Sequence, residues 1–391
     1  MTGLLTKDQY GDVNRRSSRL LVPVLVAASL IAAACGGDDS ADDTDATGPV
    51  ETSQASEPAD SAPTAITTAP VERESTEGSD DTMTTEAASD TTLAADSGDS
   101  PYPVTITHRA GETTIEQRPE RIVSLNVQWT DALLAMGETP TAYMLSSAVG
   151  EPEPYPWQAG MLDGVDVISS TGPIPFEKVA ELQPDLILVT FAAPTESDLA
   201  LLTEIAPTIG LLGDFEVDPW VDQVEVLGQV LGEPETAAAV IAGVDDEVAA
   251  VAADLPGLEG ATYTFANLVP GDSIYVIADP NDGASRLFNS LGMQLEPDIV
   301  ALDEGAVGRI QISYEEVGLL QADLVGVLLN GQDPGSIVGL SEIPSAQTGA
   351  LAIMELSDIV GLNTPSPLSV PYILDLLMPS LRIVATEGAT E

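Results

Sequence analysis

The sequence predicts an α/β protein with two lobes that a long helix connects, and three observations support this. Short apolar runs alternate with stretches of helical periodicity over residues 101–232, and again over residues 257–391. Between them, residues 233–256 keep a helical spacing of apolar side chains without a strand-like run. About 290 residues also exceed the usual size of one hydrophobic core. Strands that alternate with helices pair into parallel sheets covered on both faces, so each lobe should have three layers.

The first 34 residues have the pattern of a lipoprotein signal peptide. A basic segment with Arg15, Arg16 and Arg19 precedes an uncharged apolar run of 15 residues, 20–34. This run is shorter than the ~20 residues of a membrane span and fits a signal-peptide core. Small residues precede the only cysteine, Cys35, as in a bacterial lipobox, although Ala32 stands where Leu is usual. We expect cleavage before Cys35, lipidation of Cys35, and a location on the extracytoplasmic face of the cell membrane; an uncleaved anchor is the alternative.

Residues 35–100 are expected to form a disordered acidic tether. The stretch from residue 36 to residue 100 contains 17 acidic residues and one basic residue, Arg73, and it has no aromatic side chain. Such a composition cannot bury enough apolar surface to offset the conformational entropy of folding. The tether would let the folded part move above the membrane that holds the lipid.

The first lobe, residues 101–232, alternates expected strands and helices. Thr130 is the expected N-cap of its first helix, and Gly137 is the expected stop signal. A Pro-Asp turn at residues 184 and 185 leads into an apolar strand. The expected strands are 121–126, 139–144 and 186–191, and the expected helices are 130–137, 175–182, 197–205 and 219–231.

The connecting helix and the second lobe complete the folded part. In the helix, Val240, Val244, Val248 and Val251 repeat at helical spacing, and Pro256 ends it. The second lobe, residues 257–391, returns to the alternating pattern. Its expected strands are 263–267 and 323–329, and its expected helices are 285–292, 314–320 and 373–381.

Composition excludes several function classes. Twelve Lys and Arg against 63 Asp and Glu give a net charge of −51, which argues against nucleic acid as a partner. One cysteine excludes an intramolecular disulfide. The only histidine, His108, lies in the opening strand, so a resident zinc site is not expected. The chain lacks a G-x-S-x-G elbow, a P-loop and an H-E-x-x-H motif, so a secreted enzyme on an α/β scaffold is a distant alternative.

Several segments in order resemble the iron–siderophore substrate-binding proteins of ABC importers. They are ITHRAGETTIEQRPERIVSLN (106–126), YPWQ (155–158), FEKVAELQPDLILVT (176–190), LLTEIAPTI (201–209), ISYEEVGLLQADLVGV (312–327) and TPSPLSVPYILDLLMPSL (364–381). The resemblance implies the fold of a class III, chelatase-like periplasmic binding protein. In that fold, two Rossmann-like lobes are joined by one backbone helix.

The resemblance also implies capture of a ligand rather than catalysis. A ferric siderophore would bind between the lobes, with its iron held by the chelator and no cofactor or metal bound by the protein itself. The protein, expected to be a monomer, would deliver the ligand to the permease subunits of an ABC importer. A cobalamin or haem receptor is the nearest alternative.

Ligand-binding candidates are polar and aromatic residues near the ends of strands, where α/β sheets bind ligands. Aromatic rings suit the apolar faces of a siderophore, and Arg suits its anionic oxygens. The folded part has seven basic residues, which favours a neutral, hydroxamate-type chelate; each Arg could instead be neutralised by a nearby carboxylate. The candidates are Asn126, Gln128, Trp129, Tyr155, Trp157, Phe191, Asn267, Tyr275, Arg286 and Arg309.

Two acids match the family's permease-docking positions. Glu177 begins the helix before the PDL strand, and Glu315 begins the helix before the ADL strand. The resemblance implies that each would meet a basic pocket on one permease subunit. Glu316 is an alternative to Glu315, and helix capping is an alternative role for each acid.

Overall fold

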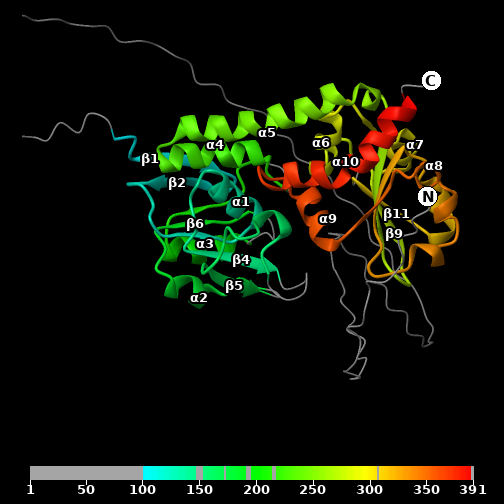
Figure 1. Cartoon of the computed structure of the whole chain (residues 1–391). Coiled ribbons are helices and arrows are strands. Elements are labelled where there is room, and N and C mark those ends of the chain that lie inside the picture. Colours follow the sequence, from blue (N-terminus) through cyan, green and yellow to red (C-terminus); the bar gives the residue numbers. More distant parts are fainter. Residues whose placement is uncertain are drawn as a thin grey trace, which may run out of the picture. The chain divides into compact units, whose positions relative to one another are not determined.

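The computed structural model of the chain describes residues 100–146, 153–170, 173–190, 195–213, 217–305 and 308–388. The expected signal peptide, Cys35 and nearly all of the acidic tether lie outside these described residues. We call the part that carries the first large sheet the N-lobe, and the part that carries the second large sheet the C-lobe (Figure 1). No helix among the described residues combines the length and the apolar character that a membrane crossing needs.

The N-lobe is a hairpin followed by a five-stranded parallel sheet in the order β5-β4-β3-β6-β7. Two hydrophobic clusters cover its opposite faces: Ile122 packs with α1 and α4, whereas the next residue, Val123, packs with α2 and α3. The parallel sheet covered on both faces is therefore confirmed. The elements are β1 (Val104–His108), β2 (Gly111–Ile115), β3 (Ile122–Ser124), α1 (Val127–Ala135), β4 (Ala142–Ser146), η2 (Pro156–Gln158), β5 (Asp166–Ser170), α2 (Phe176–Glu181), β6 (Leu186–Leu188), α3 (Glu196–Ile205), β7 (Thr208–Ile209) and α4 (Trp220–Leu231).

Helix α1 begins earlier than the sequence pattern indicates. Its N-cap is Asn126, whose side chain accepts a hydrogen bond from the Gln128 backbone N–H. The expectation of an N-cap at Thr130 is wrong, because the Thr130 hydroxyl instead bonds the Asn126 carbonyl and Ser124 inside the first turn. The expected stop is confirmed: Gly137 adopts φ 82° directly after the C-cap, a conformation that favours glycine.

The backbone helix α5 (Pro234–Asp254) joins the lobes. The chain leaves α4 through Gly232, which has φ 71° and ends that helix. Arg118 fixes the junction, since its guanidinium lies 2.5 Å from the Glu138 carboxylate and 3.0 Å from that of Glu233. Along its length α5 contacts α4 of the N-lobe and then α6 and α10 of the C-lobe (Figure 1).

The C-lobe sheet is mixed rather than parallel. Strands β8, β10, β11, β12 and β13 run in one direction, and β9 alone runs the opposite way because a tight turn at residues 269–273 sends it back along β8. The expected helix at 314–320 is a 3₁₀ helix. The elements are η3 (Pro256–Leu258), β8 (Thr262–Leu268), β9 (Ile274–Ile277), α6 (Gly283–Ser290), β10 (Gln294–Leu295), α7 (Pro297–Leu302), β11 (Arg309–Ile312), η4 (Tyr314–Leu319), β12 (Leu324–Leu328), η5 (Pro334–Ser336), η6 (Leu340–Glu342), α8 (Pro344–Thr348), β13 (Leu351–Met354), α9 (Leu356–Asn363) and α10 (Ser369–Gly388).

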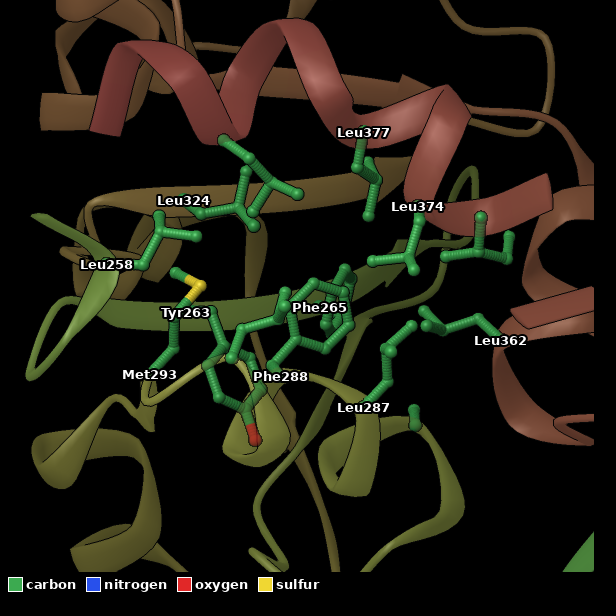
Figure 2. Close-up of a cluster of buried hydrophobic side chains, with 14 of the residues drawn as sticks. Leu258, Tyr263, Phe265, Leu287, Phe288, Met293, Leu324, Leu362, Leu374 and Leu377 are labelled. Atoms are coloured by element: carbon green, nitrogen blue, oxygen red, sulfur yellow. The ribbon is translucent and has the colours of Figure 1, made fainter. Parts of the chain in front are cut away.

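The largest core cluster lies between the C-lobe sheet and α5, α6 and α10. Figure 2 shows Tyr263 and Phe265 of β8 beside Phe288 of α6, with leucines of α10 above them. The three aromatic rings lie with centroids 4.8 to 5.8 Å apart and tilted planes. Such arrangements add about 0.5–1.5 kcal/mol per pair to the free energy that area burial alone gives.

Equivalent aspartates staple the central strands of the two lobes. In the PDL segment, the Asp185 carboxylate accepts hydrogen bonds from the backbone N–H groups of Glu120 and Arg121, just before β3. In the ADL segment, Asp323 accepts bonds from the N–H and hydroxyl of Thr262, at the start of β8. The same local sequence thus fixes the start of the first parallel strand pair in both lobes.

We predict that Asp185→Ala and Asp323→Ala each lower the free energy of unfolding by about 1 kcal/mol, since charge-assisted bonds to backbone N–H groups are lost at a partly solvated site. Urea unfolding monitored by circular dichroism measures the change. Asp163→Ala, at an exposed acid of the N-lobe, is the control. Losses no larger than that of the control would rule out the stapling role.

Candidate functional site

The contact between the lobes is centred on the carboxyl group of Asp131. This side chain lies on α1 of the N-lobe and is 0% exposed. Its Oδ2 accepts hydrogen bonds from the Trp157 indole N–H at 2.8 Å and from the Ser366 hydroxyl at 2.5 Å. Its Oδ1 accepts one from the Gln158 side-chain amide at 2.5 Å. Because Ser366 belongs to the C-lobe, one buried carboxyl group bonds both lobes.

The corner between α9 and α10 is built to dock on α1. Within the corner, the Ser366 hydroxyl also accepts the backbone N–H of Ser369, and the Ser369 hydroxyl donates to the Gly361 carbonyl. Next to Ser366, the Pro365 carbonyl accepts a hydrogen bond from the Gln128 side chain of α1 at 2.7 Å. The two bonds from α1 to neighbouring residues of the corner hold it in one orientation.

Three aromatic rings form the apolar part of the contact. Tyr155 stacks on Trp157 with ring centroids 4.8 Å apart and planes 4° from parallel. On the C-lobe side, Tyr372 of α10 lies 5.4 Å from Trp157. The Trp157 ring also lies against Gly361 of α9, where an added Cβ would stand 2.9 Å from two ring carbons. Glycine at 361 therefore makes room for the indole.

Burial dominates the ionisation of this contact. It raises the pKa of Asp131 to about 7, although the bonds from Ser366, Gln158 and Trp157 act in the opposite direction. Burial also raises the pKa of Tyr155 to about 12, with the neighbouring Asp131 charge adding to the effect. The phenol of Tyr155 therefore stays neutral at physiological pH, whereas Asp131 titrates near neutrality.

A row of polar side chains crosses one face of the C-lobe sheet. Asn267 pairs with Tyr275 in the β8–β9 ladder, and Tyr275 pairs with Gln311 in the β9–β11 ladder. Directly opposed residues point to the same face of a sheet, and residues two apart along a strand share it. Arg309 therefore lies on the same face as Gln311. This is also the face on which Tyr263 and Phe265 pack under α6 and α10.

The row begins beside the lobe contact. Arg309 bonds the Asn363 side chain at the end of α9, two residues before the Pro365 that accepts from Gln128. Tyr275 is 37% exposed, and its hydroxyl donates to Asp272. Asn267 accepts from the Asn330 amide, and Gln311 donates to Ser273. The row thus offers a ligand a phenol and carboxamides, which can both donate and accept hydrogen bonds.

Three ligand-binding candidates of the N-lobe are buried in the structure and do not face solvent. Trp129 is fully buried in the N-lobe core, so the expectation that its ring lines the ligand site is wrong for this structure. Asn126 and Gln128 are also buried, and their side chains cap α1 and bond the C-lobe corner. Tyr155 is 8% exposed and is covered by Trp157, which is itself partly exposed. Phe191 lies outside the described residues.

The structure establishes different things about the two arginine candidates. Arg309 forms an ion pair with Asp282 at 3.3 Å. A nearby carboxylate therefore neutralises Arg309, which was the alternative to its role in binding an anionic ligand. Arg286 is a partly buried residue of α6. A carboxylate beside Arg309 lowers the positive potential that it offers to an anion.

The docking candidates are exposed on both lobes. Glu177 lies in the first turn of α2, and Glu315 lies in the first turn of η4. The alternative acid Glu316 is engaged locally, since Ser313 donates to its carboxylate through both N–H and hydroxyl. Glu315 is therefore the better oriented of the two for an external partner. Elsewhere on the C-lobe, Val338 is 87% exposed, and the adjacent Gly339 lies against Val317 of η4.

Metal binding by side chains finds no support in the described part of the chain. No group of three or more His, Cys, Asp or Glu residues there is arranged to hold a metal ion. His108 lies on the hairpin and bonds the Thr113 hydroxyl, while burial lowers its pKa. Its environment is that of a neutral structural imidazole.

Some of these residues escaped the sequence analysis. Gln311 stands in the segment RIQI, where polar and apolar residues alternate, and this period-two signal indicated a half-buried strand. Asp131 stands as a single acid within an apolar helical segment. That pattern signals a buried polar group but not its partner, because Ser366 is 235 residues away.

Comparison with known proteins gives a family match and several relatives. A family profile described as periplasmic binding protein matches residues 122–331. A crystal structure of a periplasmic solute binding protein from Mycobacterium smegmatis superimposes with a TM-score of 0.61 at 27% identity, covering 72% of this chain and 98% of that one.

Two relatives carry names that specify a ligand class. The ferric enterobactin-binding periplasmic protein FepB of Escherichia coli O6:H1 is 32% identical over 160 residues, which is 38% of this chain and 48% of FepB. The probable siderophore-binding lipoprotein YfiY of Bacillus subtilis is 27% identical over 180 residues, 46% of this chain and 54% of YfiY. The matches span about half the length of each relative.

Proposed function

The chain belongs to the periplasmic binding protein family, and we propose that it captures a ferric siderophore outside the membrane and delivers it to an ABC importer. The observation that carries this proposal is its similarity to two relatives from different bacteria whose names both specify siderophore binding. The two-lobed α/β architecture supports it. The role is binding rather than enzymatic catalysis, and no resident cofactor is needed because the iron arrives within its chelator.

The polar row of the C-lobe is the proposed ligand face. It lies at the carboxyl end of β8, where α/β sheets bind ligands, and next to the contact between the lobes. Tyr275 offers an exposed ring, and Asn267 and Gln311 offer carboxamides. On the N-lobe, Trp157 is the aromatic candidate that we expect to contact the ligand, since its side chain is partly exposed at the contact between the lobes.

The charge of this face favours a neutral chelate. Asn267, Tyr275 and Gln311 carry no charge, and the guanidinium of Arg309 is paired with Asp282. A trianionic catecholate complex would meet one neutralised cation on a protein with net charge −51. A neutral trihydroxamate complex avoids this repulsion and can bond the carboxamides.

The proposed anchor and docking surfaces complete the receptor. Lipid on Cys35 would hold the monomeric protein at the outer face of the cell membrane. Glu177 and Glu315, one on each lobe, would meet basic groups of the two permease subunits, which gives orientation and fast association. Val338, which is exposed and precedes the Gly339 that lies against η4, adds an apolar side chain near this helix.

We predict that ferrichrome, a neutral trihydroxamate chelate, quenches the tryptophan fluorescence of the full chain in a saturable titration and binds at least tenfold tighter than ferric enterobactin. Tyr275→Ala and Gln311→Ala should each weaken binding about tenfold, the cost of losing one good contact. Gln294→Ala is the matched control, because Gln294 is exposed on β10 at the opposite end of β8.

Different outcomes of the titration bear on different parts of the proposal. Binding of haemin or cobalamin, with none to either siderophore, would replace the ligand class. Tighter binding of ferric enterobactin would overturn only the neutral chelate. Unchanged affinity in both row variants would overturn only the location of the ligand face.

Charge reversal tests the docking surface. The double variant Glu177→Lys/Glu315→Lys should lower uptake of ⁵⁵Fe-ferrichrome by cells at least tenfold, with unchanged ferrichrome affinity of the purified protein, because both permease contacts would become repulsive. The control Glu235→Lys/Glu247→Lys makes the same change in net charge on exposed α5 positions. Equal uptake by the two double variants would exclude this docking role.

A further inference from the structure

Among the residues that the structure describes, the acid in the lobe contact has no cationic hydrogen-bond partner. Asp131 is fully buried, and its three bonding partners, Trp157, Gln158 and Ser366, are all neutral donors. Burial of an ionised carboxylate without a cation is costly, whereas burial of the neutral acid is not. The three donors offset part of this cost. The closed contact therefore favours the protonated acid more strongly than water does.

The ionisable groups on the surrounding elements do not change this balance. They are Tyr155 beside η2, Tyr372 on α10, Asp358 on α9 and Asp218 before α4. Both tyrosines have a pKa raised to about 12, so they are neutral. Asp358 accepts the Tyr372 hydroxyl, and the Asp218 carboxylate accepts backbone N–H groups at residues 212 and 213. Each of the four is therefore neutral or acidic.

We propose that Asp131 is a proton-operated latch between the lobes, which holds the α9–α10 corner on α1 when protonated and loosens it when ionised. Asp131 suits this role because the latch has bonds on both sides. Trp157 and Gln158 tie the carboxyl to the N-lobe, and Ser366 ties it to the C-lobe. Loosening would expose the carboxylate to water and release Trp157 from its position between Tyr155 and Tyr372. The inference concerns the lobe contact itself and does not depend on the identity of the ligand.

The direction of the pH effect follows from linkage. In the closed contact the pKa of Asp131 is about 7, and in an opened, hydrated state it would be near the ordinary value of about 4. The closed state thus binds the proton more tightly. The ratio of closed to open molecules should fall about tenfold for each pH unit between ~4 and ~7, and change little above 7.

Exchange of the Trp157 indole proton measures this opening directly, since that N–H donates to Asp131. We would record it by NMR on the ¹⁵N-labelled full chain carrying Cys35→Ser, between pH 5 and pH 8.5, as protection relative to a free indole at the same pH. Protection should fall roughly 50-fold from pH 5 to pH 7 and then level off. The buried indole of Trp129 reports global unfolding in the same spectra.

Three variants separate titration of the latch from its packing. Asp131→Asn cannot ionise, so protection of Trp157 should lose its pH dependence whatever its absolute value. Ser366→Ala removes a donor that lowers the pKa of Asp131, so the levelling point should move to higher pH. Gly361→Ala crowds the Trp157 ring, so it should lower the protection of the Trp157 indole by the same factor at every pH.

Four results would overturn the latch. The first is protection of wild-type Trp157 that stays flat from pH 5 to pH 7. The second is an Asp131→Asn variant that folds and keeps the wild-type slope. The third is a fall in protection that Trp129 shares, because that indicates global unfolding. If Asp131→Asn does not fold, the Ser366→Ala variant decides the question. The fourth contrary result is that the pH at which protection levels off is the same in Ser366→Ala as in the wild type.

Discussion

The hydrogen bond from Ser366 to the buried carboxyl of Asp131 is the constraint on which the arrangement of the binding face depends. Each lobe has its own sheet and core, so their relative placement rests on the elements that join them: α5 and the contact between α1 and the α9–α10 corner. A buried polar group must find its partners, which leaves few positions for that corner. The contact is therefore specific as well as buried.

The position of the corner extends outward to the polar row. Ser366 and Pro365 are held by α1, and Asn363 at the end of α9 bonds Arg309 at the start of the row. Beyond Arg309, the backbone pairing of β11, β9 and β8 fixes the positions of Gln311, Tyr275 and Asn267. The proposed ligand face is thus pre-formed on a sheet, which lowers the ordering cost of binding.

The sequence allowed the architecture to be predicted because its signals are local. The PDL and ADL segments mark the same strand start in both lobes, and Gly137 and Gly232 mark helix ends through their backbone conformations. The mixed character of the C-lobe sheet was not foreseen. Strand β9 has four residues, and its direction depends on a five-residue turn, so its direction could not be inferred from periodicity.

The candidate site was less predictable because packing between distant segments decides which side chains are buried and which are exposed. Asn126, Gln128 and Trp129 have side chains suited to a ligand, but α1 begins three residues before the expected start of its apolar period and buries all of them. Tyr275 and Arg309 were selected because an aromatic ring and a guanidinium suit a siderophore, and the structure places both on the polar row. Gln311 could have been found with them from the alternation in RIQI. The partnership of Asp131 and Ser366 has no sequence signal, since it arises only once both lobes have folded.

The most direct test of this account is a double-mutant cycle on the bond between the lobes. The free energy of unfolding in urea at pH 5, where Asp131 is protonated and the contact is closed, would be measured for the wild type, Asp131→Ala, Ser366→Ala and the double variant. A buried hydrogen bond between neutral groups predicts a coupling energy of about 0.5–1.5 kcal/mol between the two residues. A coupling energy below about 0.3 kcal/mol would mean that the two substitutions act independently, and it would contradict the claim that this bond holds the lobes together.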